Sequence, residues 1–148
     1  MDFQAYNKIL ICPDEIEQTY AEDVTTGYQF RIKYPSYRGT FLSCIEELKF
    51  WMDEEEIPSK DISFCLNGKE FLISELPECF KEYWYVRTAA IIRVNRIGGL
   101  SEGAHSIRVY MKHRIPYTGY FGEYLVLVSD VTEKRLLQDH SHFNSHIS

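Results

Sequence analysis

The sequence contains no run of about 18 apolar residues, so it predicts no transmembrane helix. The first residues, Met1–Lys8, lack the basic start and the long apolar centre of a signal peptide. Basic side chains are also outnumbered, because 16 Lys and Arg stand against 22 Asp and Glu and leave a net charge of −6. A phosphate backbone requires a basic binding surface. We therefore expect a cytoplasmic protein with neither a nucleic-acid nor a membrane partner.

Motifs for metal binding and catalysis are missing as well. The four cysteines, Cys12, Cys44, Cys65 and Cys79, include no CxxC pair, which argues against a zinc knuckle, and we expect their thiols to be reduced. There is no GxSxG, HExxH or phosphate-loop sequence. The acidic run Asp53–Glu56 is typical of a solvated turn, since consecutive side chains do not converge on one ion.

Two histidines are the remaining candidates for chemistry. His105 and His113 share a parity with apolar residues and so are expected to face inward. An inward histidine can be a general base or a metal ligand, but it is more often a hydrogen-bonded structural residue, and we favour that interpretation. The sequence thus predicts no catalytic, cofactor-binding or metal-binding residue in this chain.

Aromatic residues, in contrast, are abundant. They form 15% of the chain, with 11 Tyr and 9 Phe, a composition that suits strands and interfaces. Apolar and polar residues alternate from Tyr28 to Tyr34, which predicts a strand with one buried face that ends at Pro35. Ala89–Arg96 and His105–Ile115 alternate in the same way.

A hairpin is predicted around Asn67-Gly68, the favoured dipeptide of a two-residue type I′ turn. The cross-strand pairs that this turn predicts are Leu66 with Lys69, Phe64 with Phe71, and Ile62 with Ile73.

Other segments complete the expected order of elements. Strands are expected at Phe3–Ile11 and at Phe41–Met52, where Ile45 and Trp51 have the outward parity. Tyr124–Val131 is nearly continuously apolar and is expected to be a central strand buried on both sides. Pro13–Asp23 is acidic and polar, and is expected to be a loop.

Together these patterns predict an all-β protein, an antiparallel β-sandwich of about 8–10 short strands with little helix. Residues 1–131 are expected to form a single domain, and residues 132–148 a polar, flexible C-terminal tail. The tail holds His140, His142 and His146, whose spacing would allow a stray metal ion but fits a disordered segment better.

An ordered series of short motifs between Val24 and Val131 resembles the β subunit of bacterial C-glycoside deglycosidases. In chain order the motifs are Tyr37-Arg38-Gly39, Leu42-Ser43-Cys44-Ile45-Glu46, Asn67-Gly68-Lys69, Glu75-Leu76-Pro77-Glu78, Gly98-Gly99-Leu100 with Gly103 and His105, and Arg114-Ile115-Pro116-Tyr117.

The resemblance implies a β-sandwich that is not itself catalytic. In that family the β subunit is required for a stable, active complex with an α subunit that resembles TIM-barrel sugar isomerases and epimerases. The α subunit would carry a divalent metal, typically Mn²⁺, and the catalytic base. The complex would act as a lyase that cleaves the C–C glycosidic bond of 3-oxo-C-glycosides of plant aromatics such as flavonoids.

Tyrosine and arginine are the residue types that anchor protein interfaces, and they gather in two loops of this sequence. We therefore expect the α subunit to be contacted by the loops after Tyr34 and after Arg114. The expected interface residues are Tyr34, Tyr37, Arg38, Arg114, Pro116 and Tyr117.

Two other functions remain open at this point. A stand-alone carbohydrate-binding β-sandwich would use Trp51, Tyr110 and the cluster Tyr83–Tyr85 as an aromatic platform for sugar rings. A small self-contained enzyme would use His105 or His113.

Overall fold

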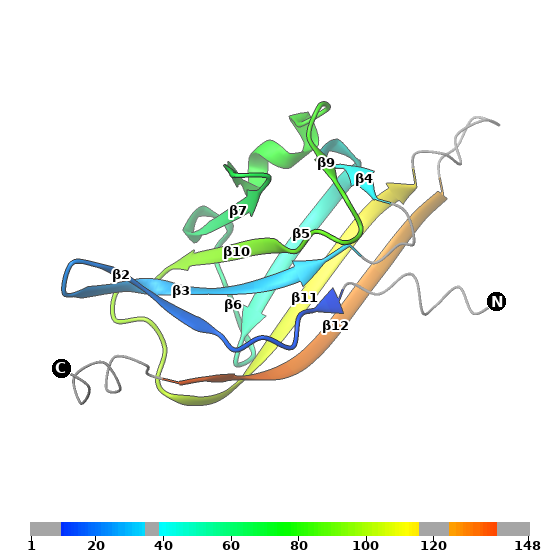
Figure 1. Ribbon diagram of the computed structural model, residues 1–148. Helices are drawn as coiled ribbons and strands as arrows, with labels where there is room; N and C mark the ends of the chain where they lie inside the picture. The colour runs from blue at the N-terminus through cyan, green and yellow to red at the C-terminus, as the bar shows by residue number, and fades with distance from the viewer. Residues whose placement is uncertain (1–9, 35–38, 116–124, 139–148) are drawn as a thin grey trace.

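The computed structural model describes residues 10–34, 39–115 and 125–138, and within them the chain is built mainly of antiparallel strands (Figure 1). The helices in these ranges are short 3-10 turns: η2 (Leu42–Cys44), η3 (Ser59–Asp61) and η4 (Ile73–Glu78). In this part of the chain no helix has the length and hydropathy required to cross a bilayer. The all-β prediction is confirmed.

The larger sheet has six strands in the order β1-β3-β10-β7-β8, with β2 also paired to β3. All of its pairs are antiparallel. Its members are β1 (Leu10–Ile11), β2 (Glu17–Ala21), β3 (Val24–Lys33), β7 (Ile62–Leu66), β8 (Lys69–Leu72) and β10 (Ala90–Asn95).

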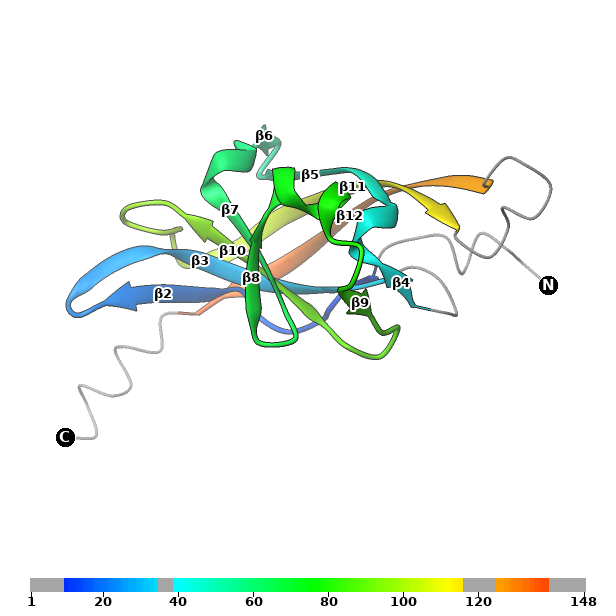
Figure 2. The same ribbon diagram turned by 90° about the horizontal axis from the view of Figure 1, so that it is seen from above.

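The second sheet has four strands in the order β12-β11-β5-β6, and a separate small sheet pairs β4 with β9. These strands are β4 (Thr40–Phe41), β5 (Ile45–Met52), β6 (Glu55–Glu56), β9 (Tyr83–Trp84), β11 (Gly103–Ile115) and β12 (Leu125–Leu137). Figure 2 shows β4 and β9 on one side of the molecule and the β2–β3 hairpin on the opposite side.

The core lies between the two large sheets, as the alternating patterns predict. Phe30 of β3 and Phe50 of β5 meet edge to face across it, with their ring centroids 5.8 Å apart. The inward residues of β3, β7, β10, β5 and β11 are all buried: Tyr28, Phe30, Ile32, Ile62, Phe64, Leu66, Ala90, Ile92, Val94, Leu48, Phe50, Met52, Ile107, Val109 and Met111. Burial of these residues supplies the main driving force for folding.

The predicted hairpin is confirmed for two of its three pairs. Asn67 and Gly68 have φ of 54° and 75°, as a type I′ turn requires. Leu66 pairs with Lys69, and Phe64 with Phe71. The Ile62–Ile73 pair is wrong, because β8 ends at Leu72 and η4 begins at Ile73.

Three expectations about the first half of the chain are wrong. The polar segment Pro13–Asp23 is not all loop, because Glu17–Ala21 forms β2, an exposed edge strand whose polar composition follows from its exposure. Phe41–Met52 is not one strand, because η2 interrupts it. Ile45 is buried rather than outward, since a β-bulge opposite Lys112 and His113 shifts the register of β5.

The last strand also differs from expectation. β12 is an edge strand rather than a central one, and Val126 and Val128 are 41% and 53% exposed. Residues Thr132–Leu137, expected in the polar tail, are instead the second half of β12, and Leu137 is buried. The histidines at 140, 142 and 146 lie outside the described residues.

Candidate functional site

The strands that lead into the two predicted interface loops finish side by side at one end of the molecule, which we call the loop end. Tyr34 directly follows β3, and His113 lies near the end of β11. The Tyr34 hydroxyl and Nδ1 of His113 are 2.6 Å apart and share a hydrogen bond. This bond joins the strand before residues 35–38 to the strand before residues 116–124.

Tyr34 is part of the core at the loop end, not of its surface. Its ring packs edge to face against Trp84 and against His113, at centroid distances of 5.5 and 5.0 Å. It is 4% exposed, so in the free chain its side chain is enclosed within the fold.

His113 is fully buried, and burial lowers its pKa to about 4. It is therefore neutral at physiological pH. Its Nε2 atom is buried without a hydrogen-bond partner among the described residues. We interpret His113 as a structural residue of the loop end, as its inward parity suggested.

Arg114 also fixes the loop end. Its Nη2 atom donates a hydrogen bond to the carbonyl oxygen of Ser43, at 2.8 Å, and so ties the end of β11 to η2. The structure thus brings Tyr34 and Arg114 to the same end of the fold. The other predicted interface residues, Tyr37, Arg38, Pro116 and Tyr117, lie outside the described residues.

Beside this end lies an exposed aromatic group, the aromatic surface cluster of Phe41, Tyr83 and Tyr85. Sequence reasoning singles out Tyr83–Tyr85 but not Phe41. The Phe41 and Tyr83 rings meet edge to face at 5.0 Å, and those of Tyr83 and Tyr85 at 4.8 Å. Phe41 is 40% and Tyr85 61% exposed, whereas Trp84 between the two tyrosines is fully buried. No local pattern assigns Phe41 to this cluster, because it meets Tyr83 only through the pairing of β4 with β9.

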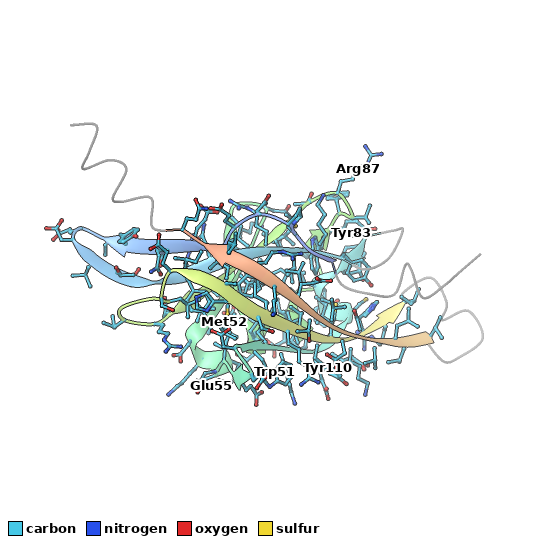
Figure 3. All side chains as sticks on the ribbon, turned by 90° about the horizontal axis from the view of Figure 1, so that it is seen from below. Trp51, Met52, Glu55, Tyr83, Arg87 and Tyr110 are labelled. Carbon is cyan, nitrogen blue, oxygen red and sulfur yellow. The ribbon has the colours of Figure 1, made fainter. Side chains whose placement is uncertain are left out.

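The aromatic platform expected of a carbohydrate-binding module is not assembled. Figure 3 shows Trp51 and Tyr110 on one side of the molecule and Tyr83 on the opposite side. The Arg108 guanidinium lies 4.3 Å from the centre of the Trp51 ring, and Asp130 holds it there with hydrogen bonds of 2.9 and 2.7 Å. Arg108 therefore covers one face of the Trp51 ring, which is then closed to a sugar.

His105 lies in a different setting, at the opposite end of β11. Nδ1 is 2.6 Å from Oδ2 of Asp53, and Nε2 is 2.6 Å from the carbonyl oxygen of Ser101. Both partners only accept hydrogen bonds, so satisfying both requires a protonated imidazolium ring. Burial acts to lower the pKa of His105, but these two hydrogen bonds outweigh it and raise the pKa above its usual value.

Asp53 is the second half of this arrangement. Its Oδ1 accepts a hydrogen bond from the backbone N–H of Ser106, at 2.9 Å. Asp53 and Glu54 have positive φ, 51° and 72°, which is unfavourable for non-glycine residues, and the bonds to Asp53 hold this tight turn in place. We call the set of Asp53, Ser101 and His105 the histidine staple.

No group of three or more His, Cys, Asp or Glu side chains that could hold a metal ion occurs in residues 10–34, 39–115 and 125–138. The four cysteines are free thiols. Burial raises the pKa of the thiols of Cys12, Cys65 and Cys79.

Comparison with known families identifies the family to which the chain belongs. The family model described as C-glycoside deglycosidase beta subunit matches residues 6–117, which is more than half of the chain. The chain belongs to the C-glycoside deglycosidase β subunit family. The loop end and the aromatic surface cluster both fall within the matched region.

Individual members of the C-glycoside deglycosidase β subunit family agree. A protein of Eubacterium cellulosolvens with that name is 36% identical over 83 residues, 56% of each chain. The "3'-dehydrocarminate deglycosidase beta subunit" of a Microbacterium species is 30% identical over 111 residues, 75% of this chain and 83% of that protein. A β subunit of Arthrobacter globiformis is 28% identical over 78 residues, 51% of this chain and 59% of its own. The alignment therefore spans little more than half of the Eubacterium and Arthrobacter proteins.

Proposed function

We propose that this chain is the non-catalytic β subunit of a heteromeric C-glycoside deglycosidase and that its loop end docks on the catalytic α subunit. Family membership supports the subunit assignment. The observation that supports this docking site is the hydrogen bond between Tyr34 and His113. It connects the strands that precede the two proposed interface loops. The chain would promote the assembly and stability of the α subunit.

The proposed reaction is a lyase reaction on 3-oxo-C-glycosides of plant aromatics, including flavonoid C-glucosides. The ketone acidifies the proton at C2 of the sugar, and a base removes that proton. The bond between C1 and the aromatic ring then breaks, and the ring carbon takes up a proton as it leaves. A divalent metal, Mn²⁺, would stabilise the enolate when bound. We place the metal and the base on an α subunit with a TIM barrel, in a cytoplasmic complex.

The test is reconstitution of the complex. The α subunit that co-purifies with this chain from the native cell is identified and co-expressed with it. We expect deglycosidase activity only when both chains are present. A chain with Tyr37→Ala and Arg38→Ala should assemble poorly. A control with Tyr20→Ala and Lys60→Ala, which replaces one tyrosine and one basic residue elsewhere, should assemble normally.

Two results would contradict the proposal. One is an α subunit that is fully active and stable without this chain. The other is a purified chain that turns over the glycoside alone, which would instead support the self-contained enzyme.

A further inference from the structure

The turn Tyr85–Thr88, which follows β9 and which we call the anchor turn, is held firmly in place. The backbone N–H of Thr88 donates to the carbonyl oxygen of Tyr85 at 3.0 Å, so Val86 and Arg87 occupy the centre of a β-turn. Nε1 of the fully buried Trp84 donates to the carbonyl oxygen of Thr88 at 2.8 Å. The anchor turn is therefore fastened to the core.

The segment before the anchor turn is supported from two sides. Nδ2 of Asn67, in the β7–β8 turn, donates to the carbonyl oxygen of Tyr83 at 3.0 Å. The backbone N–H of Leu42 donates to the carbonyl oxygen of Glu82 at 2.9 Å, and the Glu82 carboxylate is paired with Lys69. The position of the anchor turn relative to the larger sheet is fixed before any partner arrives.

The side chains that this rigid turn presents are exposed. Tyr85 is 61% exposed, and Arg87 is exposed as well. Figure 3 shows Arg87 extending outward beyond Tyr83. Arg87 forms no ion pair with any residue in the described part of the chain, and the nearby acidic residue Glu82 is already paired.

A shallow hollow of about 470 Å³ lies beside these side chains, lined by Gly39, Tyr83, Tyr85, Val86 and Arg87. Gly39 leaves room for the close approach of β9, since a Cβ atom at this position would lie 2.3 Å from the carbonyl oxygen of Trp84. The hollow thus combines aromatic walls with one uncompensated positive charge.

We propose that the anchor turn binds an acidic, partly apolar segment of the α subunit. Tyr85 packs against an apolar side chain of that segment in the hollow, and the Arg87 guanidinium pairs with a carboxylate. Tyrosine and arginine are the common energetic anchors of interfaces, and a pre-ordered turn loses little conformational entropy on binding. A carboxylate is the planar acceptor that a guanidinium fits best. This inference rests on the proposed function, because it specifies the partner's contacting segment.

The experiment measures the affinity of the chain for the co-expressed α subunit by surface-based binding kinetics. Arg87→Glu and Tyr85→Ala should each weaken binding at least tenfold, and Arg87→Lys should give an intermediate loss. The Arg87→Glu loss should appear partly as slower association at low salt. Lys60→Glu and Tyr20→Ala, as charge and tyrosine controls outside the turn, should stay within twofold of the wild type. The melting temperature of the free chain should be unchanged in the Arg87 variants, since this side chain is exposed. It should be only slightly lower in Tyr85→Ala, which loses the ring contact with Tyr83.

Three results would overturn the inference. Wild-type affinity in both Arg87→Glu and Tyr85→Ala would remove the anchor turn from the interface while leaving the proposed function intact. Unchanged assembly with a raised KM of the complex would assign the hollow to the aromatic part of the substrate instead. A wild-type chain with no affinity for the α subunit would overturn the proposed function together with this inference.

Discussion

At the scale of single residues, two buried histidines of one strand have opposite protonation states. His113 is enclosed by apolar surroundings and stays neutral, with a pKa near 4. His105 is held between the Asp53 carboxylate and a carbonyl oxygen and is stabilised as imidazolium. The positive charge of Arg96 acts to lower the pKa of His105, but its effect is the smallest of those that act on this group. Parity predicted that both histidines face inward, but not their charge, because the partners come from distant segments of the chain.

We predict that His113 makes the chain sensitive to acid. Its folded pKa of about 4 lies below the ordinary 6.5, so the unfolded chain binds more protons between these values and stability is lost as the pH falls through that window. The loss from this group is about 3 kcal/mol. Urea unfolding gives the free energy of unfolding at pH 7 and at pH 4. Its decrease between these pH values should be smaller by this amount in His113→Gln than in the wild type. Equal pH slopes for the two proteins would contradict the prediction, whatever their absolute stabilities.

The histidine staple predicts the reverse dependence at the other end of β11. Because the pKa of His105 is raised, its contribution is fully present below about pH 6.5 and is lost as the pH rises through the folded pKa. In His105→Gln, stability should fall less on going to alkaline pH than in the wild type. An NMR titration provides the direct check, since the folded protein at pH 6.5 should show N–H protons on both ring nitrogens. A single ring N–H would rule out the imidazolium.

At the scale of elements, the small β4–β9 sheet depends on one glycine. A Cβ at Gly39 would lie 2.3 Å from the Trp84 carbonyl oxygen and 2.7 Å from Cε1 of Tyr83, and backbone must move to relieve the first contact. At Gly68, by contrast, nothing lies within 4 Å of an added Cβ, and only the φ of 75° is unfavourable.

We therefore predict that Gly39→Ala lowers the free energy of unfolding by about 3 kcal/mol through overpacking. Gly68→Ala should cost only about 1 kcal/mol, the usual penalty for a left-handed conformation. Denaturant unfolding gives both values, and amide hydrogen exchange should show faster exchange in β4 and β9 for Gly39→Ala alone. If Gly39→Ala lowers the free energy of unfolding no more than Gly68→Ala does, then β4 and β9 can move apart without an energetic cost, and the prediction is wrong.

The elements also show where sequence reasoning succeeds and fails. Alternation predicted the buried faces of β3, β10 and β11, and Asn67-Gly68 predicted its hairpin, because these signals are local. The burial of Ile45 could not be predicted, since it depends on a bulge set by the register against β11. β2 was missed because an exposed edge strand carries no apolar alternation.

At the scale of the whole molecule, the sandwich follows from the sequence, but the position of each strand within its sheet does not. The apolar run of β12 predicted a central strand, whereas the structure places it at an edge. Tyr34 and Arg114, two of the predicted interface residues, lie at the same end of the fold, and their contact with an α subunit stays a prediction. The place of Phe41 in the aromatic surface cluster became apparent only with the pairing of β4 and β9, because Phe41 and Tyr83 are far apart in sequence.

The exposed apolar residues of β12 affect how well the chain stays in solution without a partner. Leu125, Val126, Val128 and Leu136 are each 41–53% exposed. A copy of the chain without a partner presents these aliphatic side chains on an edge strand to other proteins, and such exposed side chains promote aggregation. Balanced synthesis of the two polypeptides would then be an advantage, because surplus copies would be lost to precipitation or to proteases.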